Sequence, residues 1–198
     1  MNIIMNTQKT DAPSMSADFD RIYRSPYHWF WTDIRIPKEL KALLATAKPR
    51  NVLELGCGLG RFSAYVAEQG VHATGVDFSK VAIEKAVGRV AGNPYQPMFM
   101  VGDVTHLDMP DAPFDASFDV GCFHCLHKEN MYRYVSEIYR LLQPGATHLI
   151  WALYNSPCEI EIHPKYIRQI FGDKFQLVKS KFSRRRVLAS YWYWLVKK

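Results

Sequence analysis

The 198-residue chain is short enough for a single hydrophobic core, because one core commonly serves roughly 100 to 250 residues, and we expect one domain without a second large one. Its composition, 48% hydrophobic and 22% charged, is that of a globular protein, and no apolar run approaches the roughly 18 residues that a membrane helix requires. The formal charge of +6 permits an anionic partner without demanding one.

Residues 1–16 are mixed and polar, without the continuous apolar core of a secretory signal, and we expect a mobile tail. Residues 17–48 follow with many aromatic side chains and then a helix with leucines at helical spacing, which Pro49 ends. Aromatic rings bury large areas wherever they lie, so this segment either packs on the domain or lines a binding site. The candidates for substrate contact are Tyr27, His28, Trp29 and Trp31.

Residues 51–60 carry the most information, because an apolar run ends there in alternating glycines. This pattern predicts a buried strand and a tight turn that approaches a ligand, followed by a helix over residues 61–69. Dinucleotide-binding loops typically show G-x-G-x-x-G, whereas Gly56, Gly58 and Gly60 alternate. Glu54 would repel a pyrophosphate, but it can offset the positive charge of a ligand with an ammonium and a sulfonium, such as S-adenosyl-L-methionine.

Two further acidic residues follow predicted strands and favour an adenosine group in the ligand. Residues 71–77 form a strand that ends in Asp77, whose carboxylate can accept hydrogen bonds from both ribose hydroxyls. Residues 98–101 form another strand, and Asp103 comes just after it, placed to accept from an adenine amino group. Between these strands, Ser79 can cap a helix.

The rest of the chain continues the alternation of strands and helices, which implies parallel pairing, and ends in two consecutive strands. We expect strands at residues 118–123 and 147–153, helices at 129–142 and 164–171, and a closing hairpin of residues 175–182 and 187–196.

Residues 122–127, Cys-Phe-His-Cys-Leu-His, follow the fourth strand, where open sheets bind ligands. We place Cys122 and Phe123 against the methionyl part of the cofactor, and His124 or His127 at the acceptor as a general base, if the acceptor needs one. The alternative is buried cysteines with a solvated histidine. A metal site is not expected, because neighbours that cross a strand end alternate in direction and do not converge.

These motifs together resemble the class I S-adenosylmethionine-dependent methyltransferases over roughly residues 50–198. The matching stretches are residues 54–60, Asp77, residues 102–103, residues 118–120 and residues 142–145. Ala146 departs from the family, where many members carry a second glycine. The resemblance implies a Rossmann-like α/β fold, doubly wound, with a mostly parallel seven-stranded sheet and an antiparallel C-terminal hairpin. The layout is similar to the thiopurine and tellurite-resistance type of small-molecule methyltransferase.

The resemblance also implies how the single domain, residues 17–198, is divided. Residues 17–48 would form an aromatic N-terminal cover over cofactor and acceptor, and residues 50–198 the cofactor-binding core. The predicted cofactor-binding residues are Glu54, Gly56, Cys57, Gly58, Gly60, Asp77, Phe78, Asp103, Val104, Cys122 and Phe123.

The predicted function is methyl transfer from S-adenosyl-L-methionine to a small molecule by direct in-line displacement, with S-adenosyl-L-homocysteine as product. One alternative is an RNA or protein methyltransferase that docks through Lys179, Lys181 and residues 184–186, although we do not expect nucleic acid as a partner. Another is a cofactor-binding protein without turnover. The four cysteines do not form a disulfide framework, which favours the cytoplasm, and the sequence leaves the oligomeric state open.

Overall fold

The computed structural model describes residues 16–26, 35–184 and 188–198. The helices among these residues are α1 (Ser16–Arg24), α2 (Lys38–Ala47), α3 (Arg61–Glu68), α4 (Lys80–Val90), α5 (Lys128–Leu141) and α6 (Pro164–Phe171), with a short 3-10 helix, η2 (Phe123–Cys125). The strands are β1 (Asn51–Leu55), β2 (His72–Asp77), β3 (Met98–Val101), β4 (Phe114–Val120), β5 (Leu142–Leu153), β6 (Phe175–Ser183) and β7 (Ser190–Lys197).

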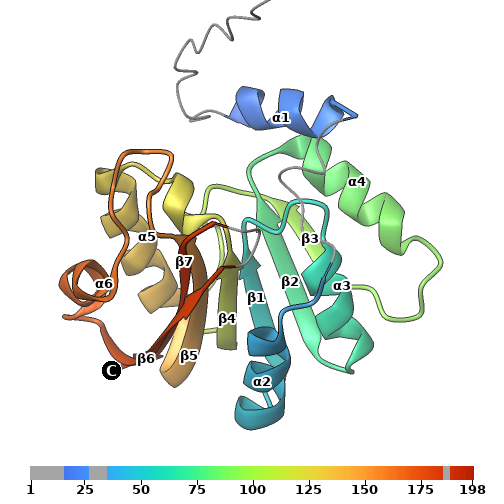
Figure 1. Ribbon diagram of the computed structural model, residues 1–198. Helices are drawn as coiled ribbons and strands as arrows, with labels where there is room; N and C mark the ends of the chain where they lie inside the picture. The colour runs from blue at the N-terminus through green and yellow to red at the C-terminus, as the bar shows by residue number, and fades with distance from the viewer. Residues whose placement is uncertain (1–15, 27–34, 185–187) are drawn as a thin grey trace, which may run out of the picture.

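The strands form one sheet in the order β3-β2-β1-β4-β5-β7-β6 (Figure 1). Pairing is parallel from β3 to β5, and β7 runs antiparallel to both of its neighbours, β5 and β6. Strand order reverses at β1 and β4, which is where open α/β sheets bind ligands at the carboxyl ends of their strands. The predicted fold class is confirmed.

Helices cover both faces of the sheet, and the alternation of side chains along each strand separates two cores. On β1, Val52 packs into the core that includes residues of α2 and α3, whereas Leu53 packs into the core that includes residues of α5 and α6. On β5, Leu149 and Ile150 divide in the same way. Because both faces are buried, these strands are continuous apolar runs, as the sequence indicated.

Local signals set most helix ends where the sequence places them. The Ser79 hydroxyl accepts a hydrogen bond from the backbone N–H of Ala82 and caps α4. Pro164 occupies the first turn of α6, where its missing N–H costs nothing. Gly70 follows α3 with a φ of 78°, a left-handed conformation that favours glycine.

Two strands begin several residues before their predicted positions. The fourth strand covers Phe114–Val120, not residues 118–123, because Gly121 has a φ of 104° and the chain then turns into η2. Strand β5 begins at Leu142, directly after α5, so the expected gap between the helix at 129–142 and the strand at 147–153 lies inside the strand. There the chain passes a register shift against β4.

Candidate active site

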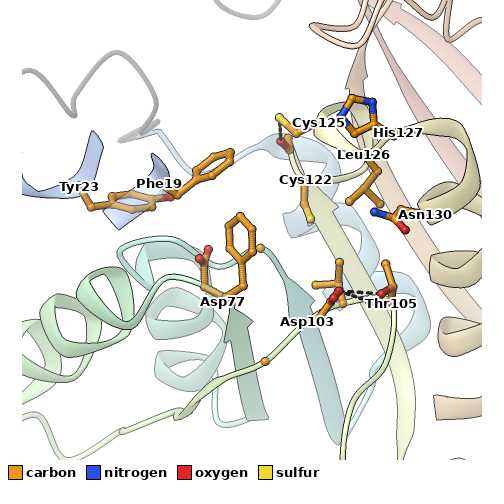
Figure 2. A pocket seen from close by; sticks show the side chains of 15 residues that line it. Phe19, Tyr23, Asp77, Asp103, Thr105, Cys122, Cys125, Leu126, His127 and Asn130 are labelled. Atoms are coloured by element: carbon orange, nitrogen blue, oxygen red, sulfur yellow. Dashed lines mark hydrogen bonds between the residues drawn. The ribbon is translucent and has the colours of Figure 1, made fainter. Parts of the chain in front are cut away.

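A cavity lies at the carboxyl ends of the parallel strands, and we call it the central cavity (Figure 2). Residues from the ends of β1 to β4, from the η2 turn and from α1 and α5 meet there. Its lining consists of Phe19, Tyr23, Gly56, Asp77, Phe78, Gly102, Asp103, Val104, Thr105, Gly121, Cys122, Cys125, Leu126, His127 and Asn130. Topology therefore brings the acidic strand ends and the Cys122–His127 segment to one place.

The glycine loop needs its glycines for two separate reasons. Gly56, Gly58 and Gly60 all have positive φ values, 68°, 51° and 69°. A Cβ on Gly56 would lie 2.5 Å from the Cβ of Cys122, and one on Gly60 would lie 2.3 Å from the ring of Phe99. Of these three glycines, Gly56 lines the cavity, whereas Cys57 is buried beneath the loop with 6% of its surface exposed.

Asp77 stands at the end of β2 and connects two backbone segments. Its Oδ2 accepts a hydrogen bond from the N–H of Gly58 at 2.8 Å, and its Oδ1 accepts from the N–H of Ser79 at 2.9 Å. Burial raises the pKa of the carboxyl to about 6. A carboxylate offers about four acceptor positions, so capacity remains for hydroxyl donors from a ligand.

The third strand end supplies a second carboxylate to the cavity. Asp103 Oδ1 accepts hydrogen bonds from the N–H of Thr105 at 2.9 Å and from its hydroxyl at 2.8 Å. Both of these hydrogen bonds end on Oδ1, and among the described residues no donor bonds to Oδ2 of Asp103. The neighbouring Val104 is 7% exposed. The prediction missed Thr105, for which the pairing of an aspartate with a hydroxyl two residues later was the available signal.

Glu54 does not lie where the prediction required it. Its side chain is 2% exposed and does not line the central cavity. Oε2 accepts hydrogen bonds from both the N–H and the hydroxyl of Ser63, which ties β1 to α3. Burial raises its pKa to about 8, so the group is largely protonated at neutral pH. This geometry supports an anchor for the loop, not the predicted direct offset of a ligand's positive charge.

A buried hydrogen-bond network holds the η2 turn, and none of its side chains was a predicted site residue. Asp119 accepts hydrogen bonds from the backbone N–H groups of Cys122 and Phe123, both at 2.7 Å, and from the Tyr134 hydroxyl at 2.7 Å. The Tyr134 oxygen lies 3.2 Å from His148 Nε2, and the Ser117 hydroxyl lies 2.7 Å from His148 Nδ1. All of these contacts are hydrogen bonds if Nε2 carries the histidine proton: Nε2–H then donates to the Tyr134 oxygen, the Tyr134 hydroxyl donates to Asp119, and the Ser117 hydroxyl donates to Nδ1.

The ionisation of this network follows from its burial. Burial lowers the pKa of His148 to about 3, which keeps the ring neutral, and raises the pKa of Asp119 to about 6, although the donors oppose that rise. At neutral pH the carboxylate is therefore charged and accepts from three directions. It fixes the turn that carries Cys122 to the cavity wall.

The two candidate bases lie in different environments. His127 is exposed and lines the central cavity beside Asn130. His124 is 5% exposed, its Nδ1 accepts from the N–H of Leu153 at 3.3 Å, and its ring meets Trp151 edge-on at 5.7 Å. His124 is not among the cavity residues. The geometry thus favours His127 at the acceptor.

Phe123 requires a correction. It was placed against the cofactor with Cys122, but its side chain is fully buried and packs on Tyr134 and Phe171. The reason is the strand boundary: in a 3-10 turn, neighbouring side chains point in other directions than they do in a strand. Cys122 does line the cavity.

The remaining candidates can be placed only in part. Tyr27, His28, Trp29 and Trp31 lie outside the described residues and stay predictions, as does the cover as a whole.

All four cysteines are free thiols. Over residues 16–26, 35–184 and 188–198, no group of three His, Cys, Asp or Glu side chains is arranged to hold a metal ion. Within the same ranges, no helix is both long and apolar enough to cross a membrane.

Comparison with known proteins agrees with this arrangement. The family model for the methyltransferase domain matches residues 52–145, from β1 to the start of β5. Over this stretch, a little under half of the chain, the sequence is similar to the methyltransferase domain family. The matched residues include the glycine loop, Asp77, Asp103 and the η2 turn. They therefore include most of the residues that line the central cavity.

Two curated relatives of the methyltransferase domain come from plants. The domain is 30% identical over 124 residues to ajmaline N-methyltransferase of Rauvolfia serpentina, covering 60% of this chain and 42% of that protein. It is 32% identical over 126 residues to the probable chloroplastic tocopherol O-methyltransferase of Oryza sativa subsp. japonica, covering 61% of this chain and 34% of that protein. The match therefore spans less than half the length of either relative.

One solved structure aligns with a larger part of the chain than these relatives do. The 1,6-didemethyltoxoflavin-N1-methyltransferase of Burkholderia thailandensis, with bound 1,6-didemethyltoxoflavin and S-adenosylhomocysteine, superposes with a TM-score of 0.74. It is 23% identical, and the superposition covers 99% of this chain and 98% of that one. The fold of that structure is thus shared by the described residues beyond the family match as well, including β6 and β7.

Proposed function

We propose that this chain transfers a methyl group from S-adenosyl-L-methionine to a small-molecule acceptor. The observation that carries the proposal is the meeting of Asp77, Asp103 and the glycine loop in one cavity at the point where strand order reverses. Two carboxylates there can accept from ribose hydroxyls and from an adenine amino group, and a loop without side chains allows close approach.

When bound, the cofactor supplies an electrophilic methyl group: a lone pair of the acceptor attacks the methyl carbon while the carbon–sulfur electron pair leaves to sulfur, giving S-adenosyl-L-homocysteine. The chain's own contribution is mainly positional, since holding reactants in line can supply roughly 7 to 11 kcal/mol. The η2 turn, fixed by Asp119, holds Cys122 at the cavity wall. His127 is the candidate base for an acceptor that enters protonated.

A small acceptor is supported more strongly than RNA. Lys179 lies over the ring of Trp194 at 4.8 Å, and Lys181 pairs with Glu39 at 2.9 Å, so two cations of the basic stretch already have partners in the chain. The plant N- and O-methyltransferase relatives and the toxoflavin-precursor enzyme also have small substrates in their names. We further propose a cytoplasmic location, which the four free thiols support.

The proposal is tested by incubating the protein with S-adenosyl-L-methionine and a panel of small amines, phenols, thiols and metalloid anions, and measuring S-adenosyl-L-homocysteine. We expect turnover on at least one class and none on RNA. Cofactor binding without turnover on any acceptor would favour a binding protein. In that panel, His127→Gln should lower turnover about 10²- to 10⁴-fold for an acceptor that loses a proton, and should leave a free amine acceptor unaffected.

A further inference from the structure

Helix α1 brings a tyrosine hydroxyl to the wall of the central cavity. Tyr23 is 8% exposed and lines the cavity together with Phe19 (Figure 2). Its hydroxyl faces the glycine loop: a Cβ built on Gly58 would lie 2.8 Å from that oxygen. The loop and α1 thus leave no room for a side chain between them, and Tyr23 belongs to the part of the cavity formed by the glycine loop and Asp77.

The position of α1 is set by residues that directly follow Asp77. Asp20 accepts hydrogen bonds from the Ser79 hydroxyl and from the N–H of Val81, which lie at the start of α4. The Ser16 hydroxyl donates to the carbonyl of Phe78 at 2.9 Å. The rings of Phe19 and Phe78 lie 5.0 Å apart. Tyr23 is therefore held relative to Asp77 by contacts of the preceding part of α1, residues 16–20.

Despite this tight placement, the Tyr23 hydroxyl makes no hydrogen bond with any residue that the structure describes. Asp77 lies near enough to raise the pKa of Tyr23 further above the level set by burial, yet the Asp77 oxygens accept from Gly58 and Ser79 instead. The phenol stays protonated and is a donor without an acceptor. The Tyr23 ring is buried, while its hydroxyl lies at the wall of the cavity, where an acceptor on a ligand can reach it.

The cavity also has an imbalance of charge. Its titratable side chains include Asp77 and Asp103, and neither lysine nor arginine is among the described residues that line it. S-adenosyl-L-methionine carries a carboxylate on its methionyl part, and this group needs donors. Beside the glycine loop, Tyr23 presents an oriented O–H that can serve.

We propose that Tyr23 is a cofactor-binding residue whose hydroxyl donates to the carboxylate of the bound S-adenosyl compound. The proposal rests on the proposed function, since it presupposes that cofactor. It assigns to α1 a role in holding the cofactor, beside the predicted role of the N-terminal cover at the acceptor.

The test compares two ligands by calorimetry on the wild-type protein and on Tyr23→Phe. S-adenosyl-L-homocysteine carries the carboxylate, whereas methylthioadenosine keeps adenine, ribose and sulfur but lacks it. We expect Tyr23→Phe to weaken binding of S-adenosyl-L-homocysteine roughly 10- to 100-fold, the usual range for a hydrogen bond to a charged group, and to leave methylthioadenosine binding unchanged. Tyr95→Phe is the matched control, because Tyr95 is 53% exposed and lies away from the cavity.

Equal losses for both ligands would overturn the proposal, because the hydroxyl would then serve the ribose or the packing. So would unchanged affinity for both. A wild-type protein that binds neither ligand would instead refute the proposed function itself. Thermal unfolding without ligand checks the variant: removing an unpaired hydroxyl while keeping the ring should leave the melting temperature unchanged or higher, and a clear decrease would contradict the absence of a protein partner.

Discussion

The glycine loop after β1 and the η2 turn after β4 face the same cavity, but different interactions fix their shapes. The loop is determined mainly by backbone conformation, because its three glycines take positive φ values that other residues rarely adopt. The turn is determined by one side chain, Asp119, which accepts from the backbone of Cys122 and Phe123. A backbone constraint can be recognised from the glycines of a short motif, whereas the role of Asp119 is visible only when the fold shows which backbone N–H groups its carboxylate accepts from.

The largest effect is expected from Asp119→Ala. This change leaves two backbone N–H groups and the Tyr134 hydroxyl without their acceptor, each at about 1 to 3 kcal/mol, partly offset by removal of a buried charge. We expect a loss of about 3 to 5 kcal/mol in the free energy of unfolding, measured in urea. Amide hydrogen exchange should increase at Cys122 and Phe123 more than at Gly58, and uniform changes would contradict separate control of the two regions.

Gly60→Ala should produce the corresponding effect on the loop. The new Cβ would lie 2.3 Å from the Phe99 ring in a backbone with a φ of 69°, so strain and overpacking together should cost about 2 to 4 kcal/mol. Gly70→Ala is the matched control: its φ is 78° but nothing lies within 4 Å of its Cβ, and it should cost only about 1 to 2 kcal/mol. Equal costs in urea unfolding would show that crowding at the loop is unimportant.

The free energy of unfolding should depend on pH through the ionisation of Glu54, the buried carboxyl group beneath the glycine loop. Folding raises the pKa of Glu54 from 4.5 to about 8, so between these values the folded chain keeps a proton that the unfolded chain has lost. Stability should therefore fall as the pH rises through this window, by roughly 1.4 kcal/mol per unit from this group.

Glu54→Gln removes that titration and keeps an oxygen acceptor for Ser63. Its stability relative to wild type should increase by about 2 to 3 kcal/mol between pH 5.5 and 7.5, measured by urea unfolding at each pH. Parallel pH profiles of the two proteins would show that Glu54 ionises normally and would reopen its predicted role as a charged ligand contact.

The smallest expected effect concerns Asp77 and the cofactor. Asp77→Ala removes the proposed ribose acceptor, which should weaken S-adenosyl-L-homocysteine binding by about 1.5 to 3 kcal/mol in calorimetry. Asp103→Ala provides the comparison on the adenine side, where contact with one amino group should cost less. Unchanged affinity in Asp77→Ala would refute the assignment of the ribose site, and NAD should bind to neither variant nor to the wild type.

Apart from α1 and η2, the sequence by itself determined the order of strands and helices, together with the strand-to-loop motif and the acidic strand ends, because each depends on neighbouring residues. Burial on both faces of β1, the cap at Ser79 and the proline that opens α6 are local in this sense. The two carboxylates at the cavity, Asp77 and Asp103, followed from their position after a predicted strand.

Only the tertiary structure decided which way the remaining side chains point. Glu54 turns to Ser63 beneath the loop, Phe123 enters the core, and His124 lies against Trp151 while His127 reaches the cavity. Tyr23 meets Gly58, 35 residues later in the chain, through contacts of α1 with α4. These placements depend on which distant groups satisfy each buried donor or acceptor, and no local pattern in the sequence specifies such partners.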